Sequence, residues 1–139
     1  MIRRSLADWG VAAEAAAWLA FGGAAIRLLP FSQVMALAGM RAGRRRDRAP
    51  PEAMVQSVRW AVTACAERWP GGAACFQRGV AAQIMLRRRG LASTLYFGAR
   101  TDGVQGPRAH VWVVFKGVDV VGGELAASYA VLAAAPPEG

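Results

Sequence analysis

Two cysteines and a single histidine are the side chains of this 139-residue chain that are best suited to catalysis. Cys75 follows a glycine-rich loop and is predicted to begin a helix, where unpaired backbone N–H groups lie at the positive end of the helix dipole. That environment can lower the pKa of a thiol and favour the nucleophilic thiolate at neutral pH. His110, at the start of a predicted strand, can act as a base and then as an acid. The alternative interpretation is that Cys75 is an unreactive cysteine and His110 an ordinary surface histidine, neither of them with a catalytic role.

The second cysteine, Cys65, is expected to be inert. It belongs to a helix predicted over residues 52–69, whose apolar side chains are spaced three and four residues apart and therefore share one core-facing stripe. The stripe consists of Val55, Val58, Val62, Cys65 and Trp69. A zinc site would need both cysteines and His110, so we expect neither a metal nor a cofactor.

Helices are predicted to come first in the chain and an antiparallel sheet afterwards, which is the order of an α+β fold. The alanine-rich N-terminal region, residues 1–48, is expected to form two or three short helices divided by Gly22-Gly23 and Pro30. Residues 49–139 are expected to form the core, with a helix over 75–89 before the strands, within one compact domain overall. Strands are predicted over residues 94–97, 110–116, 118–121 and 129–132.

Basic residues outnumber acidic ones and give a formal net charge of +8. Residues 41–51 contain five arginines and are interpreted as a solvated linker, although a functional patch there would attract an acidic partner or lipid headgroups. No aromatic residue accompanies these arginines, so nucleic-acid binding rests on charge alone and is not expected. Glu14 and Arg27 interrupt the longest apolar run, so we expect no transmembrane segment and a cytoplasmic protein.

The segment CFQRGVAAQIMLRRRGLASTLYFGA, followed by AHVWVVFKG and a late YAVL, resembles the leader peptidases of lasso-peptide biosynthesis. The N-terminal segments AEAAAWLA and RLLPFSQVMAL are similar to the helical region that precedes the core in that family. The resemblance covers nearly the entire chain. It implies a papain-like or transglutaminase-like core, in which the cysteine helix packs on a small antiparallel sheet. Val114 stands where the family's histidine strand carries a glutamate.

The resemblance also implies an activity and partners. Cys75 would be the nucleophile and His110 the base of a cysteine protease that cleaves a ribosomally made lasso precursor. Some family members carry a leader-recognition domain on the same chain, and the length of this one leads us to expect a separate recognition protein. The resemblance also implies the ATP-dependent lasso cyclase as a partner. Because this chain shows no nucleotide-binding motif, an ATP requirement would arise from that cyclase.

The acidic residue that would orient His110 has two candidates, because the family places it on the strand after the histidine and Asp119 and Glu124 follow there. A three-residue turn centred on Gly117 would set His110 opposite Glu124. The same turn would leave Asp119 about 16 Å away along the strand, which favours Glu124. The family's usual spacing falls near Gly122, which carries no acid.

Two further residues are candidates for the site. Gln77 lies two residues after Cys75 and can assist an oxyanion, although solvent exposure explains such a residue equally well. Trp112 shares the face of His110 on the predicted strand. There it can shield the imidazole, line a peptide groove or pack in the core.

The function expected from these observations is a cysteine endopeptidase that removes the leader peptide from a lasso precursor. One alternative is a transglutaminase-like acyl transferase, in which an amine replaces water in the second step. Another is a basic, non-catalytic peripheral adaptor that uses its arginines and N-terminal helix at a membrane or an acidic partner.

Overall fold

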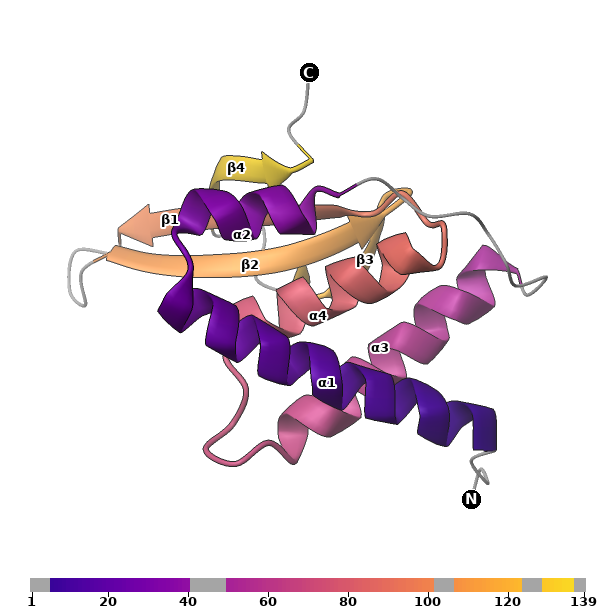
Figure 1. Ribbon diagram of the computed structural model, residues 1–139. Helices are drawn as coiled ribbons and strands as arrows, with labels where there is room; N and C mark the ends of the chain where they lie inside the picture. The colour runs from indigo at the N-terminus through magenta and orange to yellow at the C-terminus, as the bar shows by residue number, and fades with distance from the viewer. Residues whose placement is uncertain (1–5, 41–49, 102–106, 124–128, 137–139) are drawn as a thin grey trace.

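A computed structural model describes residues 6–40, 50–101, 107–123 and 129–136. Within these residues the helices come first, and they are α1 (Leu6–Leu28), α2 (Phe31–Ala38), α3 (Pro51–Glu67) and α4 (Cys75–Arg88). The strands follow, and they are β1 (Thr94–Thr101), β2 (Pro107–Phe115), β3 (Val118–Val121) and β4 (Ala130–Ala135). The strands form one antiparallel sheet in the order β3-β2-β1-β4 (Figure 1), which confirms the predicted α+β fold. The boundary predicted at residue 48 lies outside the described residues.

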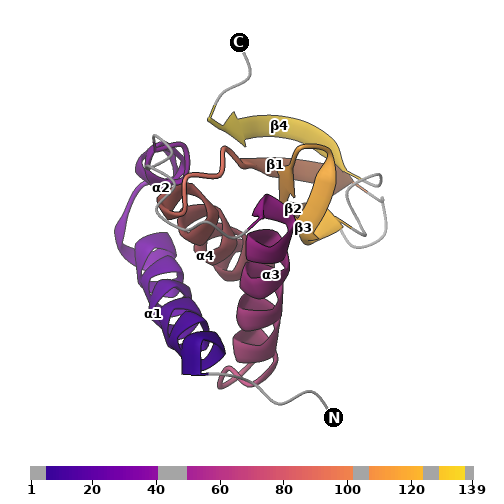
Figure 2. The ribbon, with the colours of Figure 1, turned by 90° about the vertical axis from the view of Figure 1, so that its right-hand side faces the viewer.

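α4 is the central helix. It packs on β2 and also contacts β1 and β3, while α1 and α3 pack against it and against each other (Figure 2). All residues from Gly79 to Arg87 are buried, as expected for a helix that is enclosed by other elements. The helix ends at Arg88, and Gly90 takes a φ of 81°, which suits a residue just past a helix end. Its enclosed position fixes its first residue, Cys75, beside the sheet.

α4 approaches the sheet closely at Gly79. A Cβ atom at this position would overlap Val111 Cγ1 and lie 3.6 Å from Leu95 Cδ1. Both neighbours are buried in the core, where side chains have little room to move aside. The packing of α4 on β1 and β2 therefore requires a glycine here.

Replacing Gly79 with alanine is expected to lower the free energy of unfolding by about 1–3 kcal/mol, because the added methyl group must displace Val111. The matched control is Gly10→Ala in α1, where a Cβ atom meets nothing within 4 Å. That change is expected to raise the free energy of unfolding by about 0.5–1 kcal/mol through helix propensity. Urea denaturation measures both values. Unchanged stability of Gly79→Ala would contradict the close packing, and adding Val111→Ala should restore part of the loss.

α1 runs without interruption for 23 residues, so the prediction that Gly22-Gly23 divides this region is wrong. The two glycines instead let α1 approach the start of α4. A Cβ atom at Gly22 would lie 3.4 Å from Gln77 Cα, and one at Gly23 would lie 2.8 Å from Gln77 Nε2. As one continuous helix, α1 is long and apolar enough, by length and composition alone, to cross a membrane, which the sequence reasoning did not expect.

The hairpin that carries His110 turns at Lys116-Gly117, as predicted, but its turn has two residues instead of three. A bulge near Val113 then shifts the pairing of β2 and β3 by one residue. The observed pairs are Phe115–Val118, Val114–Asp119 and, beyond the bulge, Val113–Val121. The shift brings the residues that follow β3 next to His110.

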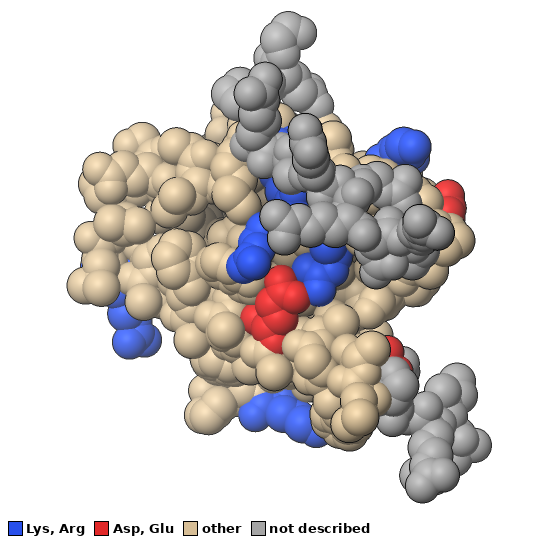
Figure 3. All heavy atoms as spheres, turned by 45° about the vertical axis from the view of Figure 1, so that its right-hand side comes forward, with Lys and Arg blue, Asp and Glu red and all other residues tan. Residues whose placement is uncertain are grey.

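Arginines at the end of α4 tie neighbouring elements together. Arg89 forms an ion pair with Glu14 of α1 at 2.6 Å, and the buried Arg87 donates hydrogen bonds to the carbonyl oxygens of Ser93 and Met40. Burial by itself would raise the pKa of Glu14, but the hydrogen bonds and charge of Arg89 outweigh it and hold that pKa below its ordinary value. Figure 3 shows acidic side chains flanked by basic ones on one face of the molecule. Arg87 and Arg89 therefore hold α1 and the segments around Met40 and Ser93 against the end of α4.

Candidate active site

A cleft of about 620 Å³ opens between α3, the start of α4 and the end of β3. It brings together Cys75, His110 and Asp119, which are far apart in the sequence. Charged side chains of both signs surround them. The cleft is lined by Arg59, Thr63, Glu67, Ala73, Cys75, Arg78, His110, Val111 and residues 119–123.

Cys75 is the first residue of α4 and is partly exposed. Gly71 and Gly72, with φ of 76° and 78°, turn the chain after α3, and Ala74 is extended where it caps the helix. The Arg78 N–H donates to the Ala74 carbonyl at 3.1 Å, so the N–H groups of Cys75 and the next two residues precede the helical hydrogen bonds. Together with the helix dipole, they can stabilise a thiolate or an oxyanion in the cleft.

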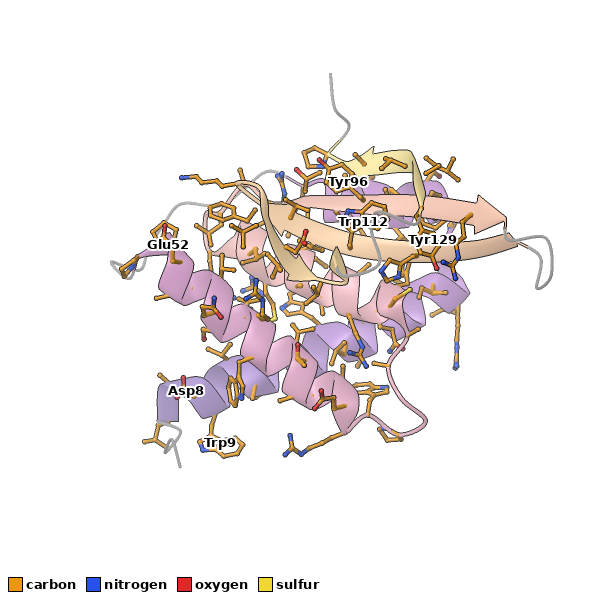
Figure 4. The ribbon with its side chains drawn as sticks, turned by 180° about the vertical axis from the view of Figure 1, so that it is seen from behind. Asp8, Trp9, Glu52, Tyr96, Trp112 and Tyr129 are labelled. Atoms are coloured by element: carbon orange, nitrogen blue, oxygen red, sulfur yellow. The ribbon has the colours of Figure 1, made fainter. Side chains whose placement is uncertain are left out.

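The imidazole of His110 is buried between aromatic rings. It stacks on Trp112 with ring centroids 5.9 Å apart, and its centroid lies 5.1 Å from that of Tyr129. Trp112 stacks in turn on Tyr96, with ring centroids 5.8 Å apart. Figure 4 shows Tyr96, Trp112 and Tyr129 following one another along the sheet. Gly98 of β1 pairs with His110 and makes room for the indole of Trp112, because a Cβ atom at residue 98 would lie 2.8 Å from that ring.

One hydrogen bond to the backbone determines the tautomer of His110. Nε2 of the ring lies 2.7 Å from the carbonyl oxygen of Gly122. A carbonyl oxygen only accepts, so Nε2 carries the proton of the neutral ring and Nδ1 keeps a lone pair. Nδ1 is therefore the atom that can take a proton from a thiol. Cys75 and this ring both line the cleft, and no hydrogen bond joins them in the described part of the chain, as is common for catalytic pairs in unliganded sites.

Among the described residues, a backbone carbonyl holds the His110 ring, and the predicted role of Asp119 or Glu124 stays a prediction. Asp119 lines the cleft, and because the turn has two residues it pairs with Val114 instead of Phe115, one residue nearer His110 along the strand than predicted. Its carboxyl group lies against Gly123, where any Cβ atom would overlap it. Glu124 lies outside the described residues. The observed partner is the carbonyl of Gly122, at the position where the family's spacing falls.

Arg59 of α3 holds β3 in place beside the cleft. Its Nε donates to the carbonyl oxygen of Val120 at 3.0 Å, and its Nη2 donates to the carbonyl oxygen of Asp119. These bonds fix the end of β3, and with it the neighbouring Gly122 carbonyl. Arg78 has a similar backbone role, since its Nε donates to the carbonyl oxygen of Ala73 at 3.2 Å.

Gln77 faces α1 instead of the cleft, so its predicted role at an oxyanion gives way to a structural one. Its Oε1 accepts a hydrogen bond from the Ala74 N–H at 3.1 Å, and its Nε2 donates to the carbonyl oxygen of Leu19 at 3.1 Å. Trp112 is buried and does not line the cleft. Of its predicted roles, core packing agrees with its burial and shielding of the imidazole agrees with its stacking on His110, whereas lining a peptide groove does not agree with its absence from the cleft lining.

Sequence reasoning missed two contributors to the site, the Gly122 carbonyl and the Tyr129 ring. A backbone carbonyl leaves no signature in residue type. The only signal in the sequence was that the spacing at which the leader peptidases place their acidic residue falls near Gly122. Tyr129 was assigned only to a predicted strand. Its position beside His110 depends on the fold, because β4 pairs with β1 and not with β2.

Cys65 is half-buried, and its thiol donates to the carbonyl oxygen of Ala12 at 3.3 Å. Burial raises the pKa of the Cys65 thiol above its ordinary value of 9.0. Because only the thiolate reacts, we expect iodoacetamide to modify Cys65 slowly at about pH 7 and faster above about pH 9. Peptide mapping by mass spectrometry across that range measures the rate. Rapid modification at neutral pH would contradict the inert environment.

Comparison with known proteins identifies the superfamily of the chain. A family model described as the transglutaminase-like superfamily matches residues 13–134, which include both Cys75 and His110. No significant match was found among curated proteins or among solved structures. Among the described residues, no three His, Cys, Asp or Glu side chains lie together in a way that would hold a metal ion.

Proposed function

Because the chain belongs to the transglutaminase-like superfamily, we propose that it is a cysteine peptidase that removes the leader from a lasso-peptide precursor. One observation carries the chemistry: Cys75, at the N-terminus of α4, shares a cleft with His110, whose Nε2 donates to the Gly122 carbonyl. The segments CFQRGVAAQIML and AHVWVV around these two residues support the lasso precursor as the substrate class.

In the proposed reaction, Cys75 Sγ forms a bond to the scissile carbonyl carbon while His110 Nδ1 accepts the thiol proton. Backbone N–H groups at the start of α4 stabilise the oxyanion. The C–N bond then breaks, and the protonated ring gives its proton to the leaving amine of the core peptide. Water hydrolyses the thioester with Nδ1 again as the base, which releases the leader as a carboxylate. The Gly122 carbonyl and the flanking rings orient the imidazole throughout.

We assign recognition of the leader to a separate protein. The described residues of the cleft include two arginines and two carboxylates, Arg59, Arg78, Glu67 and Asp119, so their charges balance and offer little attraction to a strongly charged peptide. The ATP-dependent lasso cyclase would then consume the core peptide. Since the precursor is made by ribosomes, we place this reaction in the cytoplasm.

The test is the mass of the leader product formed from a lasso precursor in the presence of a leader-recognition protein. A peptidase releases a leader with a free carboxylate at a single position. An acyl transferase, the alternative within the superfamily, would attach an added primary amine such as glycinamide to the leader. Release of the free acid with and without the amine supports the proposal. Absence of cleavage, or a product that carries the amine, contradicts it.

We expect Asp119→Asn to keep kcat/KM for leader removal within about fivefold of the wild-type value, because the Gly122 carbonyl already orients His110. The same assay of Glu124→Gln tests the acid that the predicted strand pairing sets opposite His110. A loss of about 100-fold or more in either variant would identify that residue as the acidic member of a triad.

A further inference from the structure

α1 presents an apolar face that the described part of the fold leaves uncovered. Its bulky members are Leu6, Trp9 and Leu28, whose exposed fractions are 91%, 61% and 79%. Smaller exposed residues at helical spacing connect them, and these are Gly10, Ala13, Ala17, Ala20 and Ala24. Arg27, at one end, is the charged residue on this face. Figure 4 shows Trp9 projecting away from the protein.

The opposite side of α1 is anchored in the fold. Leu19 and Gly22 are buried against α4, and the carbonyl oxygen of Leu19 accepts the hydrogen bond from Gln77. Glu14 is paired with Arg89 of the segment that follows α4. Moving α1 across a bilayer would break these contacts and expose the core. Any contact of α1 with lipid must therefore leave the helix in the plane of the membrane surface.

Charge favours one occupant of the exposed face. Arg3 and Arg4 precede α1 in the sequence, five more arginines follow α2 within residues 41–48, and the formal net charge is +8. A second copy of the chain would bring two strongly positive molecules together, which charge repulsion opposes. An anionic lipid surface is attracted by the same arginines and accepts apolar side chains between its headgroups.

We propose that the exposed face of α1 docks in the plane of an anionic membrane surface, with Trp9 and Leu28 inserted among the lipid headgroups. Trp9 suits this depth because an indole is favoured where hydrocarbon meets water. The alanines between the two ends allow the helix to lie close to the surface. Docking in this way leaves the cleft of Cys75 untouched, since none of the docking residues lines it.

The test is sedimentation of the full chain with lipid vesicles. Binding is expected to vesicles of phosphatidylcholine with about 30% phosphatidylglycerol, to be much weaker to pure phosphatidylcholine, and to fall as NaCl rises from about 0.05 M to about 0.5 M. Trp9→Ser/Leu28→Ser should lower the partition coefficient at least about tenfold. The matched control is Val131→Ser/Leu132→Ser in β4, which removes two similarly exposed apolar side chains and should bind as the wild type does.

Three outcomes would overturn the proposal. One is absence of binding to the anionic vesicles, and another is equal binding by the α1 variant and the wild type. The third is a concentration-dependent dimer in sedimentation velocity that the α1 variant abolishes, which would assign the face to a second copy. Leu28→Asp alone, with its thermal unfolding recorded, repeats the test if the double variant folds poorly. Cleavage of a soluble precursor should be unaffected, so failure here differs from failure of the proposed function.

Discussion

Cys75→Ala is expected to lower kcat/KM for leader removal by at least about 10³-fold, because no other described residue that lines the cleft carries a thiol. Cys75 is the first residue of α4 and partly exposed, so the substitution should leave the fold intact. The measurement is the rate of release of the leader carboxylate, with circular dichroism and thermal unfolding recorded for the same sample. The loss should appear in the rate at saturating substrate and not only in substrate affinity.

The matched control for this experiment is Cys65→Ala, the chain's other cysteine. Its thiol donates to the Ala12 carbonyl and lies outside the cleft lining, so we expect activity within about twofold of the wild-type value. Equal activity of Cys75→Ala and the wild type would contradict the peptidase function. It would favour the adaptor alternative, in which the thiol has no role.

Gln83→Leu is expected to lower the free energy of unfolding by about 2–4 kcal/mol, because it leaves several buried polar groups without partners. Gln83 is fully buried in α4. Its Nε2 lies within hydrogen-bond distance of the carbonyl oxygens of Ala38, Ser93 and Ala135, and its Oε1 accepts from the Ser93 hydroxyl at 2.7 Å. One amide therefore joins the end of α2, the segment before β1 and the end of β4 to the central helix.

Gln33→Leu in α2 is the control, since Gln33 is exposed and the substitution is chemically identical. Its free energy of unfolding should stay within about 0.5 kcal/mol of the wild-type value. Urea denaturation followed by circular dichroism gives both numbers. A loss below about 1 kcal/mol for Gln83→Leu would mean that the freed carbonyl groups find water or other partners.

Local patterns in the sequence predicted most of the secondary structure. The helix over 75–89 and the turn at Lys116-Gly117 are confirmed, because a glycine after a helix and a turn dipeptide between apolar strands act over a few residues. The break at Gly22-Gly23 was wrong for the opposite reason. A glycine pair weakens a helix locally, but here the close approach to Gln77 makes the small residues favourable.

Residue type and spacing were enough to predict that Cys75 begins a helix and that His110 lies on a strand of an α+β fold. That both residues line one cleft, and that a carbonyl of Gly122 holds the imidazole, depends on how the elements pack together. The two-residue turn of the hairpin also appeared only in the tertiary structure, and it paired Asp119 with Val114 instead of Phe115. The physical reason is that backbone acceptors, strand register and helix packing depend on contacts between distant segments, which no local pattern records.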